Sequence, residues 1–127
     1  MNNVASILIL AFLAITFLQS AYEKIFYWKD NVEWLKGHFA NTPLKNQVPL
    51  ALLHLLILEL ISGILSVVGA IQLLLNSGRE FGFYGAIFSC ISLLMMLFGQ
   101  RLAKDYDGAR TIVIYFIPAV MAVYWLN

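Results

Sequence analysis

Four long apolar stretches, separated by short polar connections, dominate the sequence. They cover about residues 4–22, 49–75, 81–99 and 111–126. A helix needs about 20 mostly apolar residues to cross the hydrocarbon core of a bilayer, so each stretch is long enough for one crossing or close to it. We therefore expect an all-α protein, an integral membrane four-helix transmembrane bundle that forms a single domain over residues 1–127.

The first connection carries a different pattern, which predicts an amphipathic helix over about residues 23–40. Its apolar residues recur at alternating steps of three and four, so they share one helical face. These residues are Ile25, Trp28, Val32, Leu35 and Phe39. Such a helix lies in the membrane interface with its apolar face toward the lipid.

Two roles for this interfacial helix stay open. In one, it anchors the first two spans, and Trp28, Trp34 and Phe39 are the interfacial anchors, because aromatic rings are enriched at the headgroup level. In the other, it is a lid over an opening between helices through which a lipid-soluble molecule enters.

The composition excludes most soluble functions. The chain has 127 residues, of which 61% are hydrophobic and only 12% are charged, whereas a soluble domain has about 25% charged residues. A soluble enzyme or a nucleic-acid-binding module of this size would expose much apolar surface. Cys90 is the one cysteine, which also excludes an intrachain disulfide, a CxxC redox motif and a cysteine zinc site.

Basic residues are segregated along the chain and predict its orientation. The first and third connections lie on the same side of the membrane and hold seven basic residues: Lys24, Lys29, Lys36, Lys45, Arg101, Lys104 and Arg110. The opposite side carries only Arg79 and the terminal amine. Cytoplasmic loops are enriched in lysine and arginine, so we expect a multi-pass protein of the inner (plasma) membrane with both termini outside the cytoplasm. Residues 1–3 carry no basic side chain, so we expect a retained first span and not a secretory signal.

The third connection combines basic and acidic residues. Arg101, Lys104 and Arg110 either hold the headgroups of anionic lipids or only set the topology. Residues 105–108 (DYDG) lack the further acidic ligands and the closing glutamate of a calcium loop, so we expect a turn there.

Glu59 is the most informative residue, because it is a carboxylate inside an apolar stretch. It follows Pro49 by ten residues, which corresponds to about 15 Å along a helix and places it near the middle of the hydrocarbon core. An ionised side chain at that depth is costly unless it is paired, hydrated or protonated. Three interpretations stay open: a structural hydrogen bond between helices, a hydrogen bond to the head of a quinone or lipid, and a proton shuttle in a transporter.

Other polar residues at a similar depth supply candidate partners for Glu59. These are Thr16 on the first span, Ser89 on the third and Tyr115 on the fourth, and we include all three with Glu59 in a speculative site for a quinone or lipid head. His54 is a further candidate, although it lies about 140° around the helix from Glu59. For His54 itself we expect a hydrogen bond to a neighbouring helix.

Small residues predict which spans pack together. Ser62, Gly63, Ser66 and Ala70 follow Glu59 along one face of the second span. The third span offers a similar stripe of Gly82, Gly85, Ser89, Ser92 and Gly99. Because small residues let helices approach closely in lipid, we expect these two spans to be in contact.

Two stretches of the chain resemble the DoxX family of small four-helix membrane proteins. The first is SAYEKIF at residues 20–26, followed by aromatic residues and Pro43. The second is LELISG at residues 58–63, with Gly69 beyond it. The family takes its name from a subunit of a thiosulfate:quinone oxidoreductase. The resemblance implies a four-helix bundle associated with membrane redox or respiratory assemblies, and it transfers no catalytic residue.

These observations lead to three hypotheses for the function. The chain is a non-catalytic accessory or stabilising subunit of a larger, redox-linked membrane complex; or it is a quinone- or lipid-binding component of a membrane oxidoreductase. Less favoured is a proton-coupled exporter, because the comparable small multidrug transporters carry their glutamate on the first helix. We expect partners among membrane lipids, other membrane subunits or a second copy, no nucleic acid, no metal, no cofactor other than quinone, and no catalytic activity of the chain alone.

Overall fold

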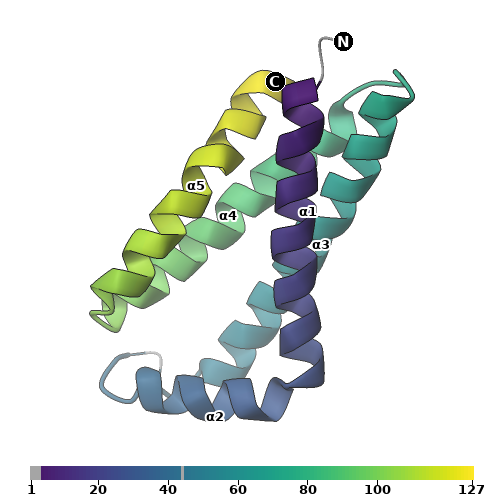
Figure 1. Ribbon diagram of the computed structural model, residues 1–127. Coiled ribbons are helices and arrows are strands. Elements are labelled where there is room, and N and C mark those ends of the chain that lie inside the picture. Colours follow the sequence, from purple (N-terminus) through teal and green to yellow (C-terminus); the bar gives the residue numbers. More distant parts are fainter. Residues whose placement is uncertain (1–3, 44) are drawn as a thin grey trace.

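The computed structural model describes residues 4–43 and 45–127, and over these residues all regular secondary structure is helical. Four long helices, α1 (Val4–Phe26), α3 (Val48–Leu74), α4 (Glu80–Leu102) and α5 (Tyr106–Leu126), surround the core, and the shorter α2 (Trp28–His38) connects α1 to α3 (Figure 1). Residues 1–3, on which we based the expectation of a retained first span, lie outside the described residues.

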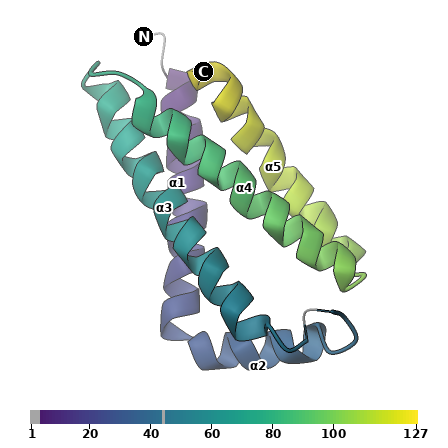
Figure 2. The same cartoon turned by 180° about the vertical axis from the view of Figure 1, so that it is seen from behind.

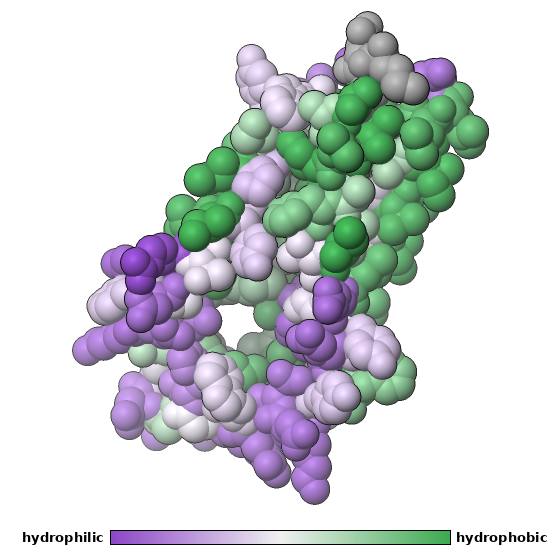
Figure 3. All heavy atoms as spheres, viewed as in Figure 1, coloured by the Kyte–Doolittle hydropathy of each residue, from purple (hydrophilic) through white to green (hydrophobic). Residues whose placement is uncertain are grey.

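Each of the four long helices is long and apolar enough to cross a membrane. Large apolar side chains cover their outer surfaces, where a soluble protein would present polar groups. Figure 3 shows apolar side chains over the upper part of the molecule, whereas hydrophilic ones gather at the end that contains α2. The fold therefore defines the protein as a multi-pass helical membrane protein.

The bundle is closed on three sides and open on the fourth. Contacts are extensive between α1 and α3, between α3 and α4, and between α4 and α5, whereas α1 and α5 touch only sparsely. The start of α1 and the end of α5 lie together at one end, and the two helices diverge toward the end that contains α2 (Figures 1 and 2). The result is a wedge-shaped gap between α1 and α5.

The close contact of α3 with α4 confirms the packing predicted from the small residues. A Cβ atom added to Gly69 would overlap with the backbone of Gly82, so the two backbones touch directly. One turn further along, a Cβ on Gly85 would lie 2.9 Å from the backbone nitrogen of Ser66. Gly63 belongs to a different contact, because the space beside it is filled by Leu18 of α1.

Three helix boundaries differ from the prediction by four or five residues: the end of α1, the start of α2, which is Trp28 and not residue 23, and the start of α5. α1 continues to Phe26 because its helical hydrogen bonds do not stop at the end of the apolar run, and the chain bends at Tyr27 before α2 begins. α5 begins at Tyr106, five residues earlier than predicted. There Asp105 is the N-cap, since its Oδ1 accepts a hydrogen bond of 3.0 Å from the backbone N–H of Gly108, so residues 105–108 form a helix start and not a separate turn.

The backbone contact between α3 and α4 leads to a stability prediction. Replacing Gly69 by alanine forces the two backbones apart, and we expect a loss of about 1–3 kcal/mol in the free energy of unfolding. Gly37→Ala is the matched control, because nothing lies within 4 Å of its added Cβ and alanine is the better helix former. Denaturant unfolding in detergent micelles measures both changes; equal stability of the two variants would contradict the packing described.

Candidate functional site

Glu59 lies on α3 and is completely buried, with an exposed fraction of 0%. Its Oε2 is 3.1 Å from the Nζ of Lys24, whose side chain is only 15% exposed. Its Oε1 accepts hydrogen bonds from Lys24 Nζ at 3.1 Å and from Ser20 Oγ at 3.2 Å. Lys24 also donates to Ser20 Oγ at 2.7 Å, so three side chains from two helices form one connected polar cluster.

The sequence pattern did not identify this cluster. Lys24 counted as a loop residue that sets topology, but it is part of α1 and points into the bundle. Helical side chains tilt toward the N-terminus of their own helix, so Lys24 leans back along α1, past Ser20 one turn earlier. The signal was present in the spacing: Lys24 follows Phe17 and Ala21, two buried residues of α1, by seven and three positions.

The predicted partners of Glu59 are therefore wrong. Thr16, Ser89 and Tyr115 form no hydrogen bond with it in the part of the chain that the structure describes. Glu59 lies near the middle of α3, whereas its partners Ser20 and Lys24 belong to the last two turns of α1. The two helices meet in this way because α3 crosses α1 obliquely from a start beside α2 (Figure 2).

One oxygen of the cluster has an incomplete set of partners. Glu59 Oε2 is inaccessible to solvent and accepts no hydrogen bond from the described residues, although Lys24 Nζ is close to it. The ammonium lies 3.1 Å from Oε2 and 3.1 Å from Oε1, so it faces both carboxylate oxygens. The carboxylate is thus charge-balanced inside the bundle.

Two adjoining cavities meet at the ion pair. The first, which we name the α1–α5 cavity, has a volume of about 340 Å³, and its wall includes Glu59, Ser20, Thr16 and Tyr115. The second, the α2 cavity, has a volume of about 270 Å³ and includes Lys24 in its wall. Both are also lined by Met96 and Ile112. Figure 3 shows the corresponding opening, which passes through the molecule above α2.

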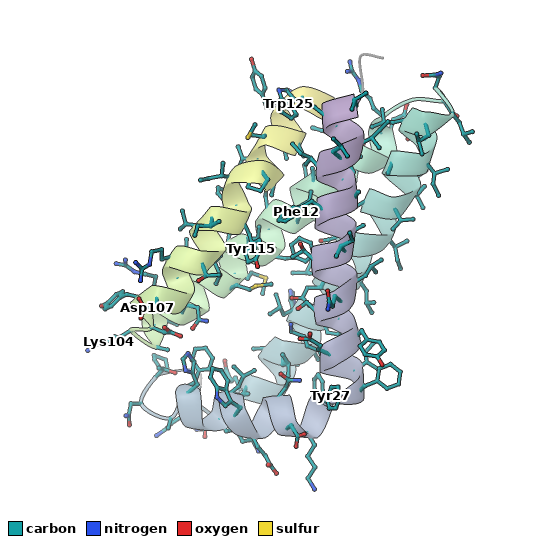
Figure 4. The ribbon with its side chains drawn as sticks, in the orientation of Figure 1. Phe12, Tyr27, Lys104, Asp107, Tyr115 and Trp125 are labelled. Atoms are coloured by element: carbon teal, nitrogen blue, oxygen red, sulfur yellow. The ribbon has the colours of Figure 1, made fainter. Side chains whose placement is uncertain are left out.

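Aromatic side chains bound the α1–α5 cavity toward the end where α1 begins. The rings of Phe12 on α1 and Tyr115 on α5 stack across the gap, with their centroids 6.0 Å apart (Figure 4). Above this contact the helices converge, and below it they separate. The stack thus marks the upper limit of the opening.

α2 closes the opposite side. His38, its last residue, places Nε2 2.9 Å from Gln100 Oε1 and 3.6 Å from Asp105 Oδ2, so α2 reaches the α4–α5 connection. The ring of Trp34 stacks on that of His38 at 4.6 Å. Phe39 packs beside Gly99 of α4. α2 therefore lies across the α2 cavity as a floor, the position that a lid would occupy.

The remaining candidate residues occupy different places. Ser89 is completely buried at the α3–α4 contact, where its Oγ donates to the backbone oxygen of Gly85 at 2.7 Å. His54 is exposed on the outside of α3, and the described residues supply no hydrogen-bond partner for it, so the expected bond to a neighbouring helix is wrong. Of the candidates for a ligand head, the structure thus brings Thr16 and Tyr115 to the same cavity as Glu59.

The proposed anchors and the basic cluster lie around the end that contains α2. Trp34 and Phe39 line the α2 cavity, whereas Trp28 does not. Arg110 is paired with Asp107, and the guanidinium of Arg101 lies 5.3 Å from the centre of the Tyr106 ring. Lys104 is exposed in the α4–α5 connection (Figure 4).

Comparisons with known proteins add no further identification. No family model, curated protein or solved structure matches this chain. The resemblance to the DoxX family thus stays a prediction from the motifs. Within residues 4–43 and 45–127, no group of three or more histidine, cysteine, aspartate or glutamate side chains is arranged to hold a metal ion.

The buried pair leads to a second stability prediction. Lys24→Met leaves the carboxylate of Glu59 buried without its counter-charge, and we expect a loss of about 3–5 kcal/mol in the free energy of unfolding. The double variant Lys24→Met/Glu59→Leu removes both charges, so most of that loss should be recovered. Lys29→Met, on the exposed side of α2, is the control and should leave stability nearly unchanged. Additive effects of the two substitutions in a double-mutant cycle would argue against the pairing.

Proposed function

We propose that this protein binds a lipid-soluble molecule with a polar head, of the quinone class, in the α1–α5 cavity. The observation that carries the proposal is the Glu59–Lys24 pair, whose carboxylate is completely buried, in the wall between two cavities of a transmembrane bundle. Membrane-embedded ionisable groups are costly, and they commonly belong to ligand or ion sites.

The shape of the site supports a ligand that enters from the membrane. The sparse contact between α1 and α5 leaves the opening on the lateral side of the bundle, where acyl chains would surround the helices. The cavity walls combine a few polar groups with apolar ones such as Phe17, Leu93 and Met96. Pockets for small molecules have this composition, and their volumes begin at about 300 Å³, so a single-ring head fits the space.

We further propose that the chain does this as a non-catalytic component of a larger membrane assembly. The opening continues from the α1–α5 cavity into the α2 cavity, so a bound head is approached from two sides of the bundle. A partner subunit docked at either side would reach the ligand. In this arrangement the chain holds the molecule, and the partner carries out the chemistry.

A cavity-blocking variant tests the binding. Met96→Trp places a large ring where both cavities meet, and we expect it to reduce retention of a decyl-substituted benzoquinone in nanodiscs by about tenfold. Met121→Trp is the matched control, since Met121 is exposed on the outside of α5 and lines neither cavity. The measurement is the amount of probe retained per protein, after subtraction of empty nanodiscs. Equal retention by both variants would contradict binding in this opening.

The orientation is part of the proposal and has its own test. We propose that the protein lies in the inner (plasma) membrane. We place α2 and the α4–α5 connection on the cytoplasmic side, because most basic residues gather there. A reporter that is active only in the cytoplasm should then be inactive when fused after Asn127 and active when inserted after Lys45. The reverse pattern would invert the proposed topology.

A further inference from the structure

We infer that α2 is a hinged lid over the α2 cavity, and that a latch at His38 closes this lid more tightly when the imidazole is protonated. Of the two roles that the sequence leaves open for this helix, the contacts therefore favour the lid. Its role as a gate for a ligand rests on the proposed function, whereas its opening is measurable without any ligand.

The middle of α2 has little support from the bundle. Val32 is the one buried residue among Trp28–His38, all of which the structure describes, and α2 packs only sparsely against α1 and α3. On its inner side, Asn31, Trp34 and Leu35 line the α2 cavity. Because few apolar groups are buried beneath it, α2 belongs to the parts of a fold that open at low cost.

The two ends of α2 are attached in different ways. At its start, the backbone N–H of Tyr27 donates to Glu23 and that of Asn31 donates to Tyr27, both at 2.9 Å. The side-chain amide of Asn31 donates to the same two backbone oxygens. After His38, the described residues that lead to α3 contain turns and no helix. A lid made of α2 therefore hinges at Tyr27 and opens at His38.

The latch consists of side chains from three parts of the chain. His38 Nε2 lies 2.9 Å from Gln100 Oε1 on α4 and 3.6 Å from Asp105 Oδ2 in the α4–α5 connection. Phe39 adds an apolar contact beside Gly99. Over the described residues, the backbone of α2 comes close to neither α4 nor α5. These side chains therefore hold the far end of α2 in place.

The groups around His38 determine how the latch responds to pH. Asp105 is the only charged side chain within ion-pair distance of His38 in the described part of the chain. The other neighbours of the imidazole, Gln100, Trp34 and Phe39, carry no charge. Histidine is the side chain that ordinarily changes its charge between about pH 5 and pH 8. Protonation therefore keeps the hydrogen bond to Gln100 and adds an attraction to Asp105, which favours the closed lid.

Asp105 is arranged so that one of its oxygens is left for this attraction. Its Oδ1 accepts the backbone N–H of Gly108 as the cap of α5, whereas Oδ2 is the oxygen on the side of His38. Two basic residues lie in or beside the same connection, Arg101 and Lys104, but neither forms an ion pair with Asp105 among the described residues. The carboxylate thus has no competing cation.

A thiol placed under the lid measures the opening of α2 directly. Leu52 is buried and lines the α2 cavity, whereas Leu50 of the same helix is 70% exposed. The experiment uses the full chain in nanodiscs, with Cys90→Ala to remove the native thiol. The rate at which a water-soluble maleimide modifies Leu52→Cys, divided by its rate with Leu50→Cys, reports the open fraction. The division also removes the effect of pH on the maleimide reaction itself.

His38→Ala removes the latch, and we expect the ratio of rates to rise about fivefold at pH 8, as for the loss of one hydrogen bond. Gln100→Leu removes the acceptor of the same bond and should change the ratio in the same direction. His54→Ala is the matched control, because His54 is exposed on the outside of α3. Unchanged ratios in both latch variants would overturn the inference.

The response to pH is the second measurement. With the native latch, the ratio should fall at least about twofold from pH 8 to pH 6, because the pair of imidazolium and Asp105 closes the lid. Asp105→Asn keeps a residue that caps a helix well but removes the charge, so most of this fall should disappear. A ratio that rises on acidification, or an equal fall in Asp105→Asn, would contradict the protonation-dependent latch.

The role of the lid as a gate has a separate test with the decyl-substituted benzoquinone. His38→Ala should speed the release of this probe to empty nanodiscs by about the factor that it raises the thiol ratio, whereas His54→Ala should not. An unchanged release rate beside a raised thiol ratio would overturn the gate. If the unmodified protein retains no probe, the proposed function fails, and the thiol ratios still decide whether α2 is a lid.

Discussion

A carboxylate that is completely enclosed by helices must be compensated by the protein, because an isolated buried charge is far too costly for a small bundle. Glu59 on α3 meets this requirement through Lys24 and Ser20, which both belong to α1. The compensation works only when α1 and α3 pack at one register and one rotation. The ion pair therefore fixes the first two long helices relative to each other more narrowly than their apolar faces would.

The rest of the architecture follows from that fixed register. α4 is held against α3 by backbone contact at Gly69 and Gly82, and α5 follows α4 closely. No comparable contact joins α5 back to α1, so these two helices diverge and leave the opening. α2 starts where α1 ends beside the ion pair, and it must cross below the opening for the chain to reach the start of α3 (Figure 1). The charged cluster, the cavities and their floor thus arise from one arrangement of helices.

Much of this fold could be predicted from the sequence, because hydropathy and small-residue spacing report on single helices and their faces. The four spans, the amphipathic α2 and the contact between α3 and α4 all follow from such patterns. The partner of Glu59 could not be found in the same way, since a lysine near a helix end has the same hydropathy whether it points to water or back into the bundle. The α1–α5 opening depends on how four helices are placed together, which no local pattern records.

The nature of the polar cluster argues against a role in stability alone. Buried ion pairs are often replaced by apolar side chains without loss of stability, so they are a weak means of holding helices together. The same bundle holds α3 to α4 with glycines and serines, for example through Ser62 and Ser92, whose hydroxyl oxygens lie 3.5 Å apart. An ion pair that lies between two cavities has a property that this contact lacks, because its charges are fixed beside open space. In the function we propose, a molecule that enters from the lipid places its polar head beside this pair.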